Sequence, residues 1–152
     1  MIVSRETPMA KGHAEALAPM VEAVMAEAGL PFSALTRIAV TTGPGTFTGL
    51  RIALSFARGL GLALKIPVIG FSSLEAMALR AAAHNLKNLP ILAIIDARRE
   101  EAYAQHFGAD GTPAASPAIL PVAHIKLPAS PIRLIGSGAH LLARPGDETA
   151  PE

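Results

Sequence analysis

The chain contains no cysteine and no tryptophan among its 152 residues. The lack of cysteine excludes disulfide scaffolds, Cys-ligated zinc, iron–sulfur clusters and thiol catalysis. Aromatic residues are limited to five Phe and one Tyr, so the side chains on which nucleic-acid bases could stack are few. Several common classes of enzyme and binding module are therefore excluded or disfavoured at the outset.

Charge is also scarce, at 16% of the chain, and thirteen Lys and Arg nearly balance twelve Asp and Glu. A net charge of +1 is too small for the basic surface that sequence-independent binding to nucleic acid usually needs. The most apolar long stretch, residues 50–68, carries Arg51, Arg58 and Lys65, which argues against a membrane span. The first residues lack the basic and apolar regions of a secretory signal. We therefore expect a soluble, cytoplasmic protein with no membrane partner.

What the chain does have is apolar residues, 51% of the total, and thirty of these are alanine. This composition predicts a packed core of small and aliphatic side chains. The spacing of apolar residues predicts helices at 13–28, 48–65 and 74–84, the first with Pro19 inside it. Short β-branched or apolar runs predict strands at 2–6, 38–40, 66–71, 91–95 and 132–135, with 101–107 pairing with 91–95 as a hairpin. Strands that alternate with helices predict an α/β fold with parallel strands.

The composition changes after Gly108, since seven of the thirteen prolines lie between Pro113 and Pro151, and we expect a domain boundary near residues 87–90. We expect residues 1–89 to form a first α/β lobe, residues 90–143 part of a second, and residues 144–152 a frayed tail.

The most informative motif is a glycine-rich turn between a strand and a helix. It consists of Gly43, Pro44, Gly45, Thr46, Phe47, Thr48 and Gly49. Such a turn can present backbone N–H groups to an anion at a helix N-terminus. The spacing fits neither the dinucleotide fingerprint nor the phosphate-binding loop, which needs a Lys. Anion binding and a purely structural tight turn are both compatible with these residues.

No residue can be assigned a catalytic role from the sequence. The five histidines include no pair at the spacing of a metal site, so we expect no metal and no cofactor. Asp96 stands at a strand end, where α/β enzymes place catalytic carboxylates, but Arg98 and Arg99 beside it favour a structural ion pair. The serines lack the context of a nucleophile elbow.

Several segments taken together resemble the TsaB (YeaZ) family, over roughly residues 2–107. The matching segments are Gly12-His13-Ala14-Glu15, the run Gly43 to Ile52, Gly59 to Ala63, Ser72-Ser73-Leu74, and Asp96-Ala97-Arg98-Arg99 with Glu101 and Tyr103. A further family-like segment runs from Ile132 to His140. The resemblance implies the actin, Hsp70 and sugar-kinase type of fold, with two related α/β lobes. It also implies that two strands of the family precede the chain's first residues and that the final helices of the second lobe are missing.

The resemblance further implies a noncatalytic scaffold in the synthesis of N6-threonylcarbamoyladenosine in tRNA. Such a scaffold pairs directly with TsaD, TsaE docks on the pair, and TsaC acts upstream. Contact with tRNA is then made only through the complex, and a homodimer forms when the chain is alone. The older description of this family as a peptidase is not supported by the residues of this sequence.

The first two long helices are expected to carry the partner-binding face, because their apolar and small positions exceed what one side of a sheet needs. The expected contact residues are His13, Leu17, Met20, Val21, Val24, Arg51, Ala53 and Ala57. For the small-residue helix, packing within the chain's own core is the competing interpretation. The competing functions are a phosphotransferase or nucleotide-binding enzyme of the same superfamily, and a nonfunctional fragment of the scaffold.

Overall fold

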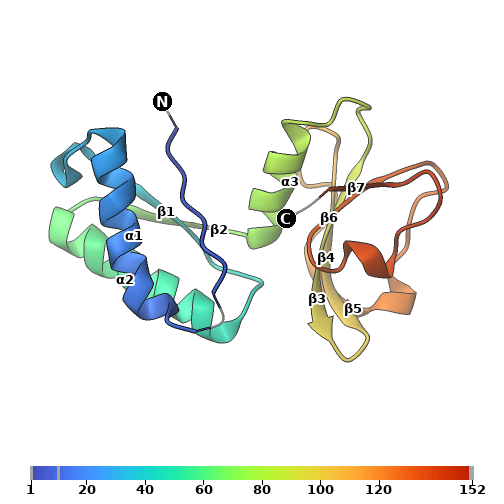
Figure 1. Cartoon of the computed structure of the whole chain (residues 1–152). Coiled ribbons are helices and arrows are strands. Elements are labelled where there is room, and N and C mark those ends of the chain that lie inside the picture. The colour runs from blue at the N-terminus through green and yellow to red at the C-terminus, as the bar shows by residue number, and fades with distance from the viewer. Residues whose placement is uncertain (1, 10, 151–152) are drawn as a thin grey trace. The chain divides into compact units, whose positions relative to one another are not determined.

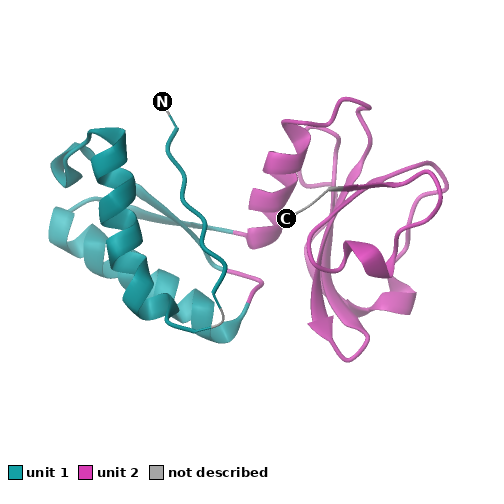
Figure 2. Ribbon diagram, in the orientation of Figure 1, with its two compact units in different colours: residues 1–42, 46–71 teal, residues 43–45, 72–152 magenta. Residues whose placement is uncertain are grey.

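The computed structural model describes residues 2–9 and 11–150 (Figure 1). The chain divides into two compact units, one made of residues 1–42 and 46–71 and the other of residues 43–45 and 72–152 (Figure 2). Each unit combines helices with a β-sheet, which confirms the predicted α/β class. The units divide between Phe71 and Ser72, while the lobe boundary expected near residues 87–90 stays a prediction.

The first unit is a β-α-β element with a second helix. Strand β1 (Ile38–Thr41) runs parallel to β2 (Val68–Phe71), and helix α2 (Phe47–Leu64) connects them. Helix α1 (His13–Ala28) precedes β1, separated from it by a short 3₁₀ turn at Phe32–Ala34. Helices α1 and α2 and strands β1 and β2 therefore lie where the sequence patterns predict them, within a few residues at each end.

Local signals set the ends of both helices in this unit. Thr46 caps α2 because its side-chain oxygen accepts a hydrogen bond from the Gly49 amide at 3.3 Å. Helix α1 stops at Gly29, whose φ of 66° lies in the left-handed region that glycine adopts readily. Pro19 lies within α1 without dividing it into two helices.

The strand expected at residues 2–6 is wrong. Residues 2–9 form neither a helix nor a strand, and among the described residues β1 has β2 as its single strand neighbour. A strand exists only where a neighbouring backbone completes its ladder, and no such hydrogen bonds reach this segment in the described part of the chain. It is joined to α1 instead by an ion pair between Arg5 and Glu27, with an N–O distance of 3.0 Å.

The second unit is built on a five-stranded mixed sheet. In sheet order its strands are β5 (Ala118–Pro121), β4 (Glu101–Phe107), β3 (Ile91–Arg98), β6 (Arg133–Ile135) and β7 (Glu148–Ala150). The predicted hairpin is confirmed, because β3 and β4 pair antiparallel. The β3–β6 and β6–β7 pairs are parallel, so the expectation of parallel pairing holds for part of this sheet. Short 3₁₀ turns lie at Val122–His124 and Ala139–Leu141.

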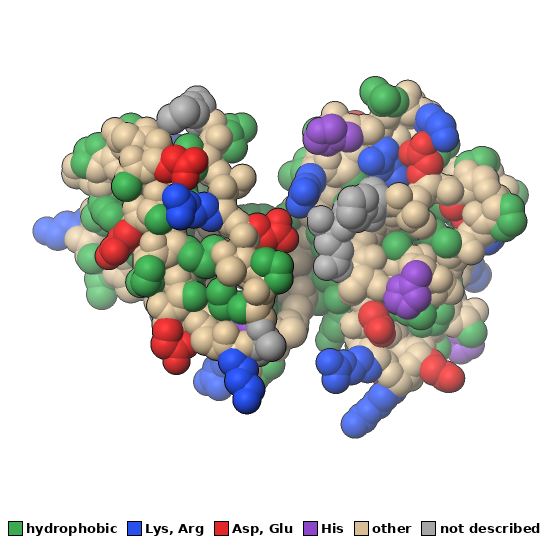
Figure 3. Space-filling model, viewed as in Figure 1, with side chains coloured by type: hydrophobic (Ala, Val, Ile, Leu, Met, Phe, Trp, Pro, Cys, Tyr) green, Lys and Arg blue, Asp and Glu red, His purple; other side chains and the backbone are tan. Residues whose placement is uncertain are grey.

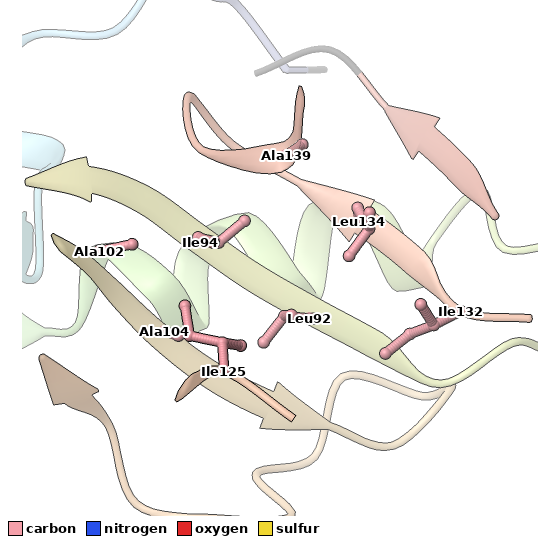
Figure 4. Close-up of a cluster of buried hydrophobic side chains, with 8 residues drawn as sticks. All are labelled: Leu92, Ile94, Ala102, Ala104, Ile125, Ile132, Leu134 and Ala139. Atoms are coloured by element: carbon pink, nitrogen blue, oxygen red, sulfur yellow. The ribbon is translucent and has the colours of Figure 1, made fainter. Parts of the chain in front are cut away.

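Both clusters of buried hydrophobic side chains lie in this unit, one on each face of the sheet. Helix α3 (Ser73–Ala82) covers one face, where Leu74, Ala78 and Ala81 pack with strand residues that include Phe107. A capping box formed by Ser72 and Glu75 begins this helix. The cluster on the opposite face comprises Leu92, Ile94, Ala102, Ala104, Ile125, Ile132, Leu134 and Ala139 (Figure 4). Because β3 contributes alternate residues to both clusters, it is the central strand of the core.

The tail expected to fray from residue 144 is ordered through residue 150, whereas residues 151–152 lie outside the described part. Strand β7 pairs with β6, and the Asp147 side chain accepts hydrogen bonds from the Ile132 amide at 3.1 Å and from Arg144. A segment held by polar side chains has no hydrophobic periodicity, so the sequence pattern did not predict that residues 144–150 are ordered.

This cap makes the second unit sensitive to acid. The Arg144 guanidinium, with help from the Ile132 and Arg144 amides, lowers the pKa of Asp147, and Lys87 lowers the pKa of Glu148. A lowered pKa in the folded state stabilises the protein above the unfolded pKa of about 4. We expect the free energy of unfolding to be nearly constant between pH 7 and about pH 5 and to fall as the pH drops through the lowered folded-state values.

Denaturant titrations at successive pH values measure this dependence. Asp147→Asn is expected to be less stable at neutral pH and to lose less stability on acidification than the parent chain. Equal acid sensitivity in the two proteins would contradict this role for Asp147.

Candidate partner-binding face

The first unit buries few of its side chains. Its buried residues in the described segments are Met25, Val40, Ala57 and Gly61. Helix α2 contributes two of these, although 18 consecutive residues of this helix are largely apolar. Figure 3 shows hydrophobic side chains at the surface among charged ones on the face where α1 lies. Apolar surface that a monomer leaves open in this way marks a contact surface for another molecule.

Helix α2 packs on the sheet with its small residues. A Cβ atom on Gly61 would collide with the Val68 side chain and approach the Ile66 carbonyl oxygen to 3.2 Å, so the helix can lie this close only with glycine there. Ala57 is one helical turn before Gly61 and is 4% exposed. The structure therefore places Ala57 inside its own unit, so its prediction as a contact residue is wrong and the core interpretation holds for this side of α2.

The adjoining side of α2 faces α1 across an open groove of about 330 Å³. The helices line it with His13, Ala16, Leu17 and Met20 from α1 and Gly49, Ile52 and Ala53 from α2. The segment of Arg5, Glu6, Thr7 and Met9 forms its remaining wall. Four of the expected contact residues, His13, Leu17, Met20 and Ala53, are thus brought together. Leu17, Met20 and Ala53 are half-buried, which leaves part of each side chain available to a partner.

A second hollow, of about 400 Å³, lies between the same helices and is lined by Ala14, Leu17, Arg51, Ile52, Ser55 and Phe56. The Arg51 guanidinium lies 4.8 Å from the centre of the Phe47 ring, a cation–π contact at an exposed position. Arg51 and Leu17 therefore line this second hollow, and their contact with a partner stays a prediction. Val21 and Val24 are half-buried on α1 but line neither hollow.

Sequence reasoning missed Ile52 and Phe56. Ile52 borders both hollows, and Phe56 follows it at the four-residue spacing that places two side chains on one helix face. The spacing of Ile52 and Phe56 is present in the sequence, but the small residues around them on this helix predict close helix packing instead.

The glycine-rich turn has structural partners for its main chain. Gly43 has a φ of 114°, which favours glycine, and its carbonyl oxygen accepts a hydrogen bond from the Ser73 amide at 2.9 Å. Thr46 caps α2, and a Cβ atom on Gly49 would come within 2.7 Å of the Thr46 hydroxyl oxygen. These contacts favour the tight-turn interpretation, while anion binding stays a prediction.

Asp96 is not paired with the guanidinium groups beside it in the sequence. Its carboxylate accepts a hydrogen bond from the Arg98 backbone amide at 2.7 Å, and the Asp96 amide donates to the Ser137 hydroxyl at 3.1 Å. The expected ion pair is therefore wrong, because the local turn offers the carboxylate a closer backbone donor. Across residues 2–9 and 11–150, no three side chains of metal-ligating type gather into a cluster.

By length and composition, α2 is the one helix in the described part of the chain that could cross a membrane. Core helices of soluble proteins pass the same test, and this helix rests on the β1–β2 sheet through Ala57 and Gly61. We take its apolar character as part of the groove and of the sheet contact.

Three comparisons with known proteins show which family and which solved structures this chain is similar to. The family model described as "TsaD: tRNA N6-adenosine threonylcarbamoyltransferase" matches residues 7–139. The solved structure of YeaZ from Pseudomonas aeruginosa superposes with a TM-score of 0.80 at 32% identity, covering 92% of this chain and 70% of that one. The Escherichia coli "tRNA threonylcarbamoyladenosine biosynthesis protein TsaB" is 37% identical over 98 residues, which are 64% of this chain and 42% of that protein. An uncharacterized protein of Mycobacterium bovis is 36% identical over 136 residues, 90% of this chain and 61% of its own length.

The fold and the family match define the class, an α/β protein of the actin, Hsp70 and sugar-kinase type. Within that class the chain belongs to the TsaB (YeaZ) family. It spans 31% and 61% of the lengths of the first two curated relatives. The resemblance found in the sequence is thereby confirmed.

Proposed function

We propose that this chain is a noncatalytic scaffold that pairs with the transferase TsaD in the synthesis of N6-threonylcarbamoyladenosine in tRNA. Its family relatives carry the name of that biosynthesis, and the family model that it matches is described by the transferase activity. TsaE docks on the pair, TsaC acts upstream, and tRNA is reached through the complex. This biosynthesis takes place in the cytoplasm.

The observation that carries the proposal is the open groove between α1 and α2. The helices line it mainly with apolar residues, of which Leu17, Met20 and Ala53 are half-buried, in a unit whose own core is small. A helix pair from a partner of related fold would bury this surface, since helices with small residues approach each other closely. The same face supports a homodimer when the partner is absent.

The alternative, a phosphotransferase of the same superfamily, receives less support from these residues. No lysine or acidic residue stands in the turn of residues 43–49 to hold a phosphate or act as a base. Asp96 has its carboxylate engaged with the Arg98 amide.

Two measurements test the proposal. The purified chain, mixed with the TsaD encoded by the same genome, is expected to elute as a complex by size exclusion with light scattering. Alone, given ATP, peptides or glycoproteins, it is expected to show background turnover only. A saturable rate that Asp96→Ala removes would show that the chain is an enzyme, and separate elution at micromolar concentrations would show that it is not this scaffold.

A further inference from the structure

The outer edge of strand β2 in the first unit has no strand beside it. Among the described residues, the sheet of this unit consists of β1 and β2 alone. The Ile38 amide of β1 donates a hydrogen bond to the Pro67 carbonyl oxygen at 3.0 Å, so Pro67 faces β1. Because successive residues of a strand direct their hydrogen-bonding groups to opposite edges, Val68 and Gly70 direct theirs outward. An edge of this kind is a template on which another extended chain can pair.

An open hollow of about 580 Å³ adjoins this edge within the same unit. It is lined by Arg58, Gly59, Gly61, Leu62, Lys65, Ile66 and Val68. A Cβ atom on Gly59 would meet open space, and Leu62 is 82% exposed although its side chain is large and apolar. The hollow therefore has room and apolar surface for a side chain of a strand that lies along β2.

Apolar side chains flank the edge on both faces of the sheet. The Val68 side chain lies on the face that α2 covers, since a Cβ atom on Gly61 would collide with it. Ile69 therefore points to the opposite face, where it is 45% exposed. A third strand beside β2 covers part of Leu62 on one face and part of Ile69 on the other, which adds apolar burial to its main-chain hydrogen bonds.

The hollow is positively charged. Arg58 and Lys65 line it, and no acidic residue does. The sequence has no Asp or Glu between Glu27 and Glu75, so α2 and β2 carry no negative side chain. Neither Arg58 nor Lys65 forms an ion pair with a described residue. A ligand that carries carboxylates therefore complements this hollow.

We propose that the outer edge of β2 binds an extended acidic peptide segment of another protein, which adds to this sheet as a third strand. The main chain of the peptide bonds to Val68 and Gly70, an apolar side chain lies against Leu62, and a carboxylate lies near Arg58 or Lys65. In strand addition, the main-chain hydrogen bonds provide affinity and the adjoining hollow selects the side chains.

The edge of a second copy of this chain fits the site less well than an acidic peptide does. Residues 65–71, which include β2, contain Lys65 and no acidic residue, and the four residues of β1 carry no charge. Neither strand of the first unit in another copy supplies the carboxylate that the hollow favours.

A random peptide library displayed on phage and selected on the immobilised chain tests the proposal. The selected peptides are expected to contain Asp or Glu and to alternate polar with apolar or β-branched residues, as strands do. One selected peptide is then synthesised with a fluorescent label, and its dissociation constant is measured by anisotropy.

Two variants of the hollow are expected to bind the labelled peptide more weakly. Arg58→Glu and Leu62→Asp should each reduce affinity about fivefold or more, because each places a negative charge where the peptide's carboxylate lies. Both positions are exposed, so the melting temperature should not change. Arg80→Glu is the matched control, because it makes the same charge change at an exposed position on α3 in the second unit. It is expected to leave affinity within about twofold.

Methylated peptide amides separate strand addition from a simple contact of charges. N-methyl groups are placed on every second amide of the peptide, first in one register and then in the other. One register removes the hydrogen bonds to Val68 and Gly70, whereas the other places its methyl groups away from β2. We expect one register to weaken binding about tenfold more than the other.

The remaining outcomes also decide. Selection of no acidic peptide, or binding that Arg58→Glu and Leu62→Asp leave unchanged, would overturn the proposal. Equal loss with the two methylated registers would overturn the addition of a strand. Dimerisation of the chain that Leu62→Asp removes and the peptide does not inhibit would assign the edge to a second copy instead. The proposal does not rest on the proposed function, and these assays need no TsaD, so a failure to pair with TsaD is observed separately.

Discussion

Ala53→Arg is expected to abolish detectable binding of TsaD while the chain remains folded. Ala53 is half-buried in the wall of the groove between α1 and α2. In the free chain an arginine there can extend into solvent, whereas a partner seated on the groove would bury its charge without a counterion. Such burial costs several kcal/mol, and about 4 kcal/mol corresponds to a loss of roughly a thousandfold in affinity. Isothermal titration calorimetry of the chain into TsaD measures the loss.

Ala63→Arg provides the matched control. Ala63 is exposed on the same helix and lines neither hollow of the face, so the same substitution there should leave affinity within about twofold. Leu17→Asp on α1, at a residue that lines both hollows, tests the other helix independently. Unchanged melting temperatures would show that both variants are folded, and unchanged co-elution of both with TsaD would exclude this face as the interface.

The largest expected effect on stability is that of Gly136→Ala. Gly136 has a φ of 102°, and a Cβ atom there would collide with the Met77 side chain and the Ile94 carbonyl oxygen. Left-handed strain of about 1 to 3 kcal/mol and overpacking of about 1 to 3 kcal/mol add to roughly 4 kcal/mol. Because Gly136 follows β6 beside the central strand, we expect the sheet of the second unit to unfold at a much lower denaturant concentration.

Two further glycines separate those contributions. Gly146 has a φ of 93° with open space around its Cβ position, so Gly146→Ala should cost only the strain. Gly138 has a φ of −88°, and its Cβ would lie 2.7 Å from Ile94 Cγ1, so Gly138→Ala should cost only the overpacking. Tyr103, the single tyrosine, lies on β4 and its fluorescence follows the unfolding of this sheet. An effect of Gly136→Ala no larger than that of Gly146→Ala would contradict the close packing at β6.

Elements with strong local patterns were predictable from the sequence, and elements that depend on distant partners were not. Helices α1, α2 and α3 have apolar periodicity with recognisable ends, and the β3–β4 hairpin joins two adjacent strands. Strand β7 is three residues long and depends on β6 and on the Asp147 cap, which no local pattern reveals. Residues 2–6 are the opposite case: their composition is typical of a strand, but no strand of the described chain pairs with them.

The candidate partner-binding face likewise has residues that a local pattern predicts and residues whose place depends on distant contacts. The stripe of Leu17 and Met20 on α1 was visible as a 3.6-residue pattern, and both residues line the groove. Ala53 and Ala57 are equivalent in the sequence, being small residues one turn apart on α2. Only the packing of Gly61 against Val68 shows that Ala57 belongs to the sheet side, while Ala53 remains at the groove.

The path of the chain through its two units limits how they can be separated. Residues 43–45 belong to the second unit although the segments on both sides of them belong to the first. A gene fragment that begins at Ser72 would lack Gly43, whose carbonyl oxygen receives the amide of Ser73 at the start of α3. Residues 1–71 contain the whole first unit in one uninterrupted piece, whereas the second unit needs residues 43–45 as well as residues 72–152. A design that supplies both pieces would therefore be needed to study the second unit alone.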